Sequence, residues 1–167
     1  MKIRDLLPLG LPRFGLAELE SRGITDLEPL QAAAVEAGLF SGNNLLIVAP
    51  TSTGKTLVGE LAALQHAVAR NGTVFVTSHK ALAYEKYLTF RESYSREESF
   101  HFATGIATGD EVTDEGALDD VPLTVATYEK WYYMLIDRPQ LLKRRSLLVV
   151  DEIQMIGDRH RGDLRLR

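Results

Sequence analysis

Eight residues, Ala-Pro-Thr-Ser-Thr-Gly-Lys-Thr at positions 49–56, constrain the fold of this chain more than any other feature. They follow the short apolar run Leu45–Ala49, which predicts a buried strand, and they open a segment with helical spacing. Their spacing is that of a phosphate loop in which alanine replaces the usual first glycine. Because such a loop joins a strand to a helix, it predicts an α/β domain.

The residue types in this loop suit phosphate binding. Backbone N–H groups of the loop and of the helix N-terminus point at one spot, where phosphate oxygens bind. Gly54 allows close approach of the backbone, Lys55 is expected to reach the β- and γ-phosphates, and the Thr56 hydroxyl is expected to ligate Mg²⁺. A chance Gly-Lys-Thr tripeptide is the alternative, and the full eight residues in this setting argue against it. The remaining loop residues expected at the nucleotide are Thr51, Ser52 and Thr53.

A second motif consists of two acids at the end of an apolar strand. Leu147–Val150 predicts a strand, and Asp151 and Glu152 follow it directly. At the carboxyl end of a strand beside a phosphate loop, Asp151 is expected to hold Mg²⁺ and Glu152 to position and deprotonate the attacking water. The alternative is a strand capped by solvated acids, which is common when no phosphate loop accompanies it.

The rest of the chain alternates short apolar strands with helices. This alternation predicts a three-layer α/β fold, in which helices cover both faces of a parallel sheet and ligands bind at the carboxyl ends of its strands. Residues 1–40 are expected to form a helical lead-in, and residues 1–167 a single domain. Further strands are predicted at Thr73–Thr77, Phe100–Thr104 and Leu123–Thr127, and helices at Gly54–Arg70, Lys80–Arg91 and from about Glu129.

Composition excludes some classes of site. The chain has no cysteine, which rules out disulfides and a zinc–thiolate site. Its net charge of −4 does not by itself favour nucleic-acid binding, although a local basic strip is sufficient for phosphate contacts. The sequence has no apolar run long enough to span a membrane and no signal-peptide pattern, so we expect no membrane partner and a cytoplasmic location.

Together the two motifs resemble the first RecA-like motor lobe of the superfamily-two DExH/DEAD helicases, over about residues 25–162. Residues 49–56 resemble motif I of that family, and Asp151-Glu152-Ile153-Gln154 resembles motif II. Gln31 lies in a segment similar to the glutamine motif, whose amide offers a donor and an acceptor to adenine. The resemblance implies a phosphate-loop ATPase lobe that uses ATP and Mg²⁺.

Three further segments resemble nucleic-acid contacts of that family: Lys80-Ala81-Leu82, Thr108-Gly109-Asp110 and the string Val-Ala-Thr-Tyr-Glu-Lys at 125–130. The resemblance implies that Lys80, Thr108, Gly109 and Thr127 contact the nucleic acid, although Thr127 is also a good N-cap. The last string, with Asp-Glu-Ile at 151–153, is similar to the Ski-like group. Within that group the resemblance is to archaeal DNA repair helicases related to the helicase domain of polymerase theta, which implies 3′-to-5′ movement on single-stranded DNA.

The sequence also departs from the family pattern. Gln154 stands where this group usually has a histidine that couples the ATP site to motif III, and glutamine still donates and accepts hydrogen bonds. Motif III and the second RecA-like lobe are not recognised, so we expect a fragment of a longer protein whose partners are that second lobe and single-stranded nucleic acid. Because an arginine finger contributes a factor of about 10³–10⁵ in related enzymes, the chain alone is expected to be nearly inactive.

Other functions stay open at this point. An RNA helicase of the same group would carry the same motifs, since lobes that grip the backbone contact phosphates and sugars more than bases. A nucleic-acid-dependent ATPase switch that does not unwind, or a small-molecule kinase outside the helicases, is also compatible with a phosphate loop. The resemblance favours DNA over RNA.

Overall fold

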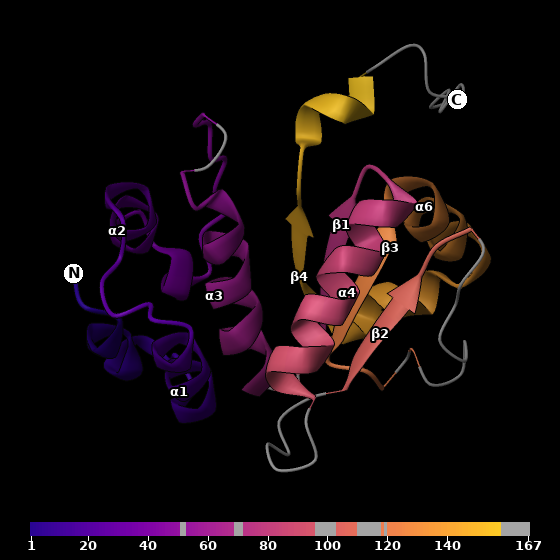
Figure 1. The fold of residues 1–167 in the computed structure, drawn as a ribbon. Helices are drawn as coiled ribbons and strands as arrows, with labels where there is room; N and C mark the ends of the chain where they lie inside the picture. Colours follow the sequence, from indigo (N-terminus) through magenta and orange to yellow (C-terminus); the bar gives the residue numbers. More distant parts are fainter. Residues whose placement is uncertain (51–52, 69–71, 96–102, 110–117, 119, 158–167) are drawn as a thin grey trace.

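A computed structural model of the chain describes residues 1–50, 53–68, 72–95, 103–109, 118 and 120–157. Its centre is a sheet of four parallel strands in the order β2-β3-β1-β4 (Figure 1). The strands are β1 (Gly72–Thr77), β2 (Thr104–Ala107), β3 (Leu123–Thr127) and β4 (Arg145–Val150). The predicted parallel sheet is confirmed, and its parallel strands are joined by crossover connections that include helices.

Helices cover both faces of this sheet, so the predicted three-layer arrangement is also confirmed. On β1, Phe75 packs in one buried cluster with residues of the helices before and after the strand, whereas Val74 and Val76 pack in a second cluster with Trp131 and Met134. Such alternation is the period of a strand that is covered on both faces. The helices concerned are α3 (Lys55–Val68), α4 (Lys80–Tyr94) and α6 (Tyr128–Asp137), with the short 3-10 helices η3 (Pro139–Arg144) and η4 (Ile153–Gly157).

A glycine lets α3 lie close to the sheet. A Cβ atom built on Gly59 would lie 2.8 Å from Val149 Cγ1 and 3.1 Å from the Phe75 ring. Any larger residue would therefore push the helix away from β1 and β4, or displace their side chains. Because α3 begins at Lys55, this close contact also places the phosphate loop against the end of the sheet.

The predicted helical lead-in is confirmed and packs against α3. Figure 1 shows α1 and α2 on the side of α3 that faces away from the sheet. Ile3, Leu6 and Leu19 are fully buried there and share a cluster with Leu61 and Leu64 of α3. None of the described helices is long and apolar enough to cross a membrane. The lead-in consists of η1 (Ile3–Leu9), α1 (Arg13–Ser21), α2 (Pro29–Glu36) and η2 (Leu39–Ser41).

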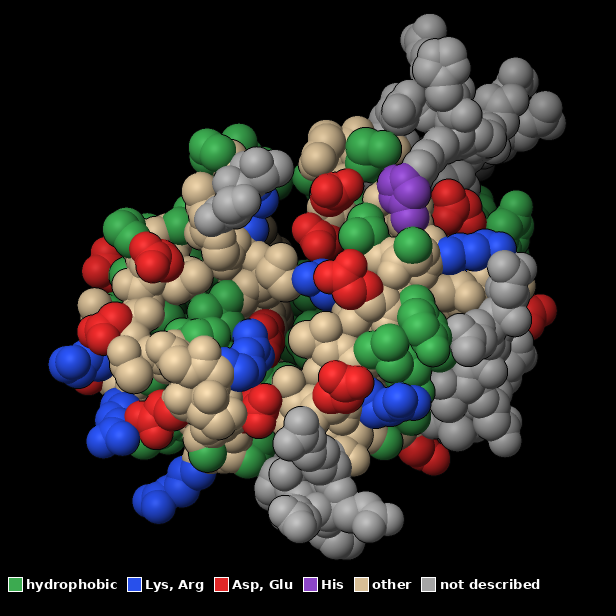
Figure 2. All heavy atoms as spheres, viewed as in Figure 1, with side chains coloured by type: hydrophobic (Ala, Val, Ile, Leu, Met, Phe, Trp, Pro, Cys, Tyr) green, Lys and Arg blue, Asp and Glu red, His purple; other side chains and the backbone are tan. Residues whose placement is uncertain are grey.

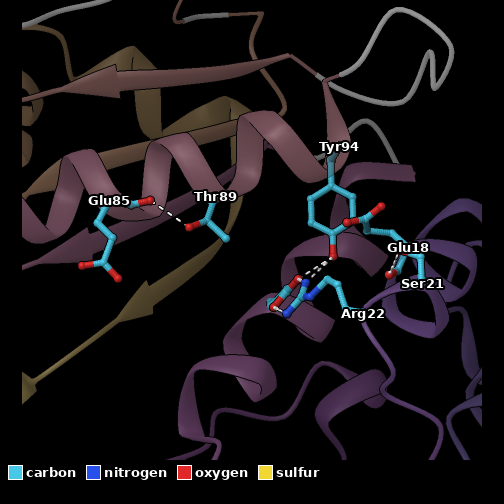
Figure 3. Close-up of polar contacts among 7 residues, drawn as sticks. Glu18, Ser21, Arg22, Glu85, Thr89 and Tyr94 are labelled. Carbon is cyan, nitrogen blue, oxygen red and sulfur yellow. Dashed lines mark hydrogen bonds and ion pairs between the residues drawn. The ribbon is translucent and has the colours of Figure 1, made fainter.

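A buried carboxylate fastens the lead-in to the rest of the domain. Glu60 of α3 accepts hydrogen bonds from both terminal nitrogens of Arg22 and, at 2.5 Å, from the hydroxyl of Tyr94 at the end of α4. Figure 3 shows Arg22 and Tyr94 meeting from two different elements. Burial and the Glu60 carboxylate raise the pKa of Tyr94, so this hydroxyl stays a donor. A charge-assisted, two-pronged arginine contact of this kind fixes geometry as well as adding stability.

One predicted strand is wrong. Residues 45–49 were expected to form a buried strand, but they belong to no strand, and Leu46 and Val48 are 74% and 86% exposed. The sheet was expected to be covered on both faces, yet at β4 one face is partly open, because Leu148 is 53% exposed. β4 is also an edge strand of the described sheet. The physical reason is pairing: within the part of the chain that the structure describes, no strand lies beside residues 45–49 to bind their N–H and C=O groups.

Candidate functional site

In the described part of the phosphate loop, side chains form hydrogen bonds with main-chain carbonyl groups of the same loop. Lys55 Nζ donates to the carbonyl oxygens of Ala49 and Pro50, each at 2.6 Å, and Thr53 Oγ1 donates to the same Pro50 oxygen at 2.8 Å. The lysine is the first residue of α3, so its ammonium stands at the helix N-terminus, where anions bind favourably. Thr56 follows it and is half-buried. Thr51 and Ser52, also expected at the nucleotide, lie outside the described residues.

Gln31 contacts the phosphate loop directly. Its side-chain oxygen accepts from the Glu28 N–H at 2.8 Å, and its side-chain nitrogen donates to the Gly54 carbonyl at 3.3 Å. Gly54 has φ +73°, and a Cβ at this position would lie 2.2 Å from the Gln31 amide nitrogen. The sequence predicted that Gly54 makes room for phosphate; in the structure the same missing side chain makes room for Gln31.

Asp151 and Glu152 directly follow β4, at the end of the sheet where α3 begins (Figure 1). The Asp151 N–H donates to the carbonyl oxygen of Val76 at 3.0 Å, which continues the pairing of β4 with β1. Glu152 has φ +53°, the one non-glycine residue in the left-handed region among those described. Such a backbone costs roughly 1–3 kcal/mol unless its surroundings hold it in place, and it is typical of functional turns.

The oxygen donors near the phosphate loop suit Mg²⁺ better than they suit a metal ion whose ligands are all protein side chains. Among the described residues, no group of three or more His, Cys, Asp or Glu side chains is arranged to hold a metal ion. Mg²⁺ does not need such a group, because it usually binds one or two carboxylates together with waters and substrate phosphates. The Asp151 carboxylate and the Thr56 hydroxyl are oxygen donors of that kind, so their role as magnesium ligands stays a prediction that the residues fit.

A pocket of about 340 Å³ lies at the carboxyl ends of β1 and β3. It contains two lysines, one acid and one tyrosine that is 65% exposed. The residues that line it are Ser78, Lys80, Gly109, Thr127, Glu129, Lys130 and Tyr133. A mixed but lysine-containing wall with an exposed ring suits a phosphodiester with an attached sugar or base.

Three of the four residues predicted to contact nucleic acid line this pocket. The Lys80 side chain lies close to the Gly109 backbone, because a Cβ atom built on Gly109 would lie 3.1 Å from the lysine Cε. Thr127 is the N-cap of α6, since its hydroxyl accepts from the Lys130 N–H at 3.3 Å, as expected for threonine at this position. Thr108 is buried at the end of β2 and is not part of the wall.

The other residues of the pocket wall were not predicted from the sequence, although the register between β1 and β3 would have indicated them. Thr77 pairs with Thr127, so the residues that follow the two strands must lie side by side. Ser78 follows the first strand, and Glu129 and Lys130 occupy the first turn of α6 after the second. Tyr133 lies one helical turn beyond Glu129, which places it on the same face of the helix.

Tyr128 lies between two residues of the pocket wall and contacts the first member of the acidic pair Asp151 and Glu152. It is the first residue of α6, and its hydroxyl donates to the main-chain carbonyl oxygen of Asp151. Burial, together with the negative charges of Asp151 and Glu152, raises the pKa of Tyr128 to about 12. The hydroxyl therefore keeps its proton and remains a donor at neutral pH.

Gln154, predicted to couple the two sites, lies in η4 with its side chain exposed. That role stays a prediction. On the face that Figure 2 shows, lysine and arginine side chains are interspersed with aspartate and glutamate. This face therefore offers an anionic ligand local contacts rather than a broad positive field.

Comparison with known proteins identifies relatives of this chain. The sequence model of a family described as DEAD/DEAH box helicase matches residues 28–166. The chain is 38% identical over 147 residues to the ATP-dependent DNA helicase Hel308 of Pyrobaculum calidifontis, and 37% identical over 145 residues to that of Pyrococcus horikoshii. These matches cover 88% and 86% of this chain, which spans only 20% of the length of either relative.

A solved structure shares the fold. The crystal structure of the DUF1998 helicase MrfA superposes on 86% of this chain with a TM-score of 0.74, and the matched part is 24% of that protein. Sequence identity is 20%, so this likeness shows the fold alone. It agrees with the RecA-like arrangement expected from the sequence.

Proposed function

Because this chain belongs to the DEAD/DEAH box helicase family, we propose that it is the ATP-binding first motor lobe of a longer ATP-dependent helicase. The proposed substrate is single-stranded DNA, along which the whole protein moves from 3′ to 5′. A second RecA-like lobe of the same protein closes over the nucleotide. The names of the relatives, which are DNA helicases, support DNA over RNA.

One observation carries the proposal: the acidic pair and the lysine-containing pocket lie at carboxyl ends of strands in one parallel sheet, and α3 begins at the phosphate loop at the same end of that sheet (Figure 1). Ligands of such sheets bind at this edge. A motor lobe needs a nucleotide and a nucleic acid close enough to influence each other. The arrangement supports that requirement.

At the nucleotide, each residue has a role that follows from its position. Lys55 exchanges the carbonyl oxygens of Ala49 and Pro50 for the β- and γ-phosphates, a better match for a full positive charge. Asp151 and Thr56 would hold Mg²⁺, which when bound offsets phosphate charge. Glu152 accepts a proton from the attacking water. Gln31 donates to the Gly54 carbonyl, and so responds to the shape of the loop as well as to adenine.

At the pocket, Lys80 and Lys130 bind a backbone phosphate, and Thr127 with the α6 N-terminus adds N–H donors. Contacts of this kind grip a strand without reading its sequence. The grip therefore suits translocation along any sequence.

The test is steady-state ATP hydrolysis by the full-length protein that contains this chain, with no nucleic acid, with single-stranded DNA and with single-stranded RNA. DNA should stimulate hydrolysis, and Lys55→Ala should lower the stimulated rate by a factor of about 100 or more, because a transition-state charge contact is lost. Strand displacement from substrates with 3′ or 5′ tails then gives the polarity.

A second variant separates grip from hydrolysis. Lys80→Ala should weaken DNA binding about equally for all sequences and reduce the slope of log affinity against log salt by about 1, as loss of one phosphate contact does. Stimulation by RNA alone would move the protein to RNA helicases. No stimulation by either nucleic acid, with activity still lost in Lys55→Ala, would exclude a nucleic-acid motor.

A further inference from the structure

The backbone of Asp151 is held at both of its polar groups, and the carbonyl group is the one that belongs to the peptide between Asp151 and Glu152. The Asp151 N–H donates to the Val76 carbonyl of β1 at 3.0 Å, and the Asp151 carbonyl accepts from the Tyr128 hydroxyl. Glu152 follows with φ +53°. The angle φ measures rotation relative to the Asp151–Glu152 peptide plane, so a contact that holds this plane helps to set the direction in which the Glu152 side chain leaves the backbone.

The residue that holds the Asp151 carbonyl does not line the pocket itself but lies between two residues that do. Tyr128 lies between Thr127 and Glu129, and both of these neighbours line the pocket, as Lys130 does. Its ring is half-buried and packs with the cluster that contains Val76 and Val150, so it cannot turn away without disturbing the sheet. A ligand that shifts the first turn of α6 therefore shifts the Tyr128 hydroxyl with it.

We propose that Tyr128 is a positioning residue that transmits occupancy of the pocket to Glu152. When a nucleic-acid backbone holds the first turn of α6, the hydroxyl holds the Asp151–Glu152 peptide, and Glu152 stays where it can take a proton from the attacking water. This inference rests on the proposed function, since it needs nucleic acid in the pocket and ATP at the phosphate loop. If nucleic acid in the pocket also changes the affinity for ATP, linkage requires ATP to change the affinity for nucleic acid by the same factor.

The experiment uses Tyr128→Phe in the full-length protein, a change that removes the hydroxyl and keeps the ring. The measured quantity is kcat for ATP with saturating single-stranded DNA divided by kcat without it. This ratio should fall at least about fivefold, the lower end of ordinary coupling factors, while KM for ATP and Kd for DNA change by about twofold or less. Tyr132→Phe, on the same helix but outside the pocket wall, is the matched control and should keep the ratio of the wild type.

A second readout distinguishes positioning from a general structural role. The affinity for single-stranded DNA is measured with and without a non-hydrolysable ATP analogue, and the factor between the two should move toward 1 in Tyr128→Phe. Loss of stability alone would lower the melting temperature and leave this factor unchanged.

The outcomes separate the two proposals. If the wild type is stimulated by DNA and Tyr128→Phe keeps both its stimulation and its ATP-dependent DNA affinity, the role of Tyr128 is overturned and the proposed function stands. If the wild type itself responds to no nucleic acid, both are overturned. A reduced ratio in Tyr128→Phe with a normal ratio in Tyr132→Phe supports the inference.

Discussion

β1 and residues 45–49 are both predicted from the sequence as strands, and they have opposite surroundings. β1 lies between β3 and β4, and all its residues from Gly72 to Thr77 are buried. Residues 45–49 lie outside the sheet, with Leu46 and Val48 largely exposed. β4 is intermediate: it pairs with β1 on one side, and every second residue along its first half is more exposed. In the described sheet, β2 also has a strand on one side only and is nevertheless buried along its whole length, so burial depends on what covers a segment as well as on the strands beside it.

The comparison teaches that an apolar run indicates a capacity for burial rather than burial itself. A strand exists only where a neighbour binds its main-chain groups, and its side chains are covered only where helices or strands lie over them. An edge such as that of β4 also offers unpaired N–H and C=O groups to another chain. Three tests, each with its own control, show how far this difference between centre and edge holds.

The largest effect is expected from Phe75→Ala in the central strand. Phe75 is fully buried, and its ring meets that of Phe90 edge to face at 5.6 Å. The change should lower the free energy of unfolding by about 3–5 kcal/mol, as for other buried phenylalanines. Leu148→Ala on β4 is the matched change at the edge and should cost less than about 1 kcal/mol, because half of that side chain is already in water.

Urea unfolding of both variants measures the two costs at constant slope. Equal losses in Phe75→Ala and Leu148→Ala would mean that the outer edge of β4 is covered in solution, and the distinction between centre and edge would fail.

A smaller effect is expected from Gly59→Ala, which tests the covered face of the edge strand. The added methyl would crowd Val149 and Phe75, at a cost of about 1–3 kcal/mol. The better helix propensity of alanine offsets roughly 1 kcal/mol of this. Combination with Val149→Ala provides the control, because removal of the crowded methyl should make the double variant less destabilised than the sum of the two. Additive losses would show that α3 does not press on β4.

The smallest effect concerns His66, which joins α3 to the beginning of β4. Its Nδ1 lies 2.6 Å from the Ser146 hydroxyl, and burial lowers the pKa of His66 from its ordinary 6.5. The unfolded chain therefore takes up this proton first. Stability associated with the neutral ring is complete above pH 6.5, declines as the pH falls below that value, and is lost below the folded pKa.

Thermal unfolding of the wild type and of His66→Asn between about pH 8 and about pH 5 measures this contribution. The difference between the two should change only below pH 6.5. A constant difference across the range would show that His66 is fully hydrated, with no role at the edge.

Much of the fold was predictable because its signals are local. The phosphate loop, the acids after Leu147–Val150 and the spacing of Leu57, Leu61 and Leu64 each depend on neighbours in sequence. The predicted strand at 123–127 matches β3. Residues 100–102 of the strand expected at 100–104 lie outside the described residues, and β2 begins at Thr104, the last residue of that prediction.

The rest depended on which segments pair, and local patterns do not contain that information. The position of β4 at the edge and the lack of pairing at residues 45–49 are both of this kind. The wall of the pocket also follows from the register between β1 and β3. The sequence placed Tyr128 in a motif only, and its contact with Asp151 could not be predicted because the two residues are far apart in sequence.

The shared carboxylate of Glu60 also sets an order of events during synthesis. Its two partners lie on either side of it in the chain, Arg22 before it and Tyr94 34 residues after it. At ribosomal rates of about 5–20 residues per second, the nascent chain carries this acid for about 2–7 seconds before the tyrosine has been added. During that interval Arg22 can supply the compensating charge, but the tyrosine hydroxyl that also orients the buried acid is absent. The contact that joins α4 to the amino-terminal helices through Glu60 therefore forms only after translation has passed residue 94.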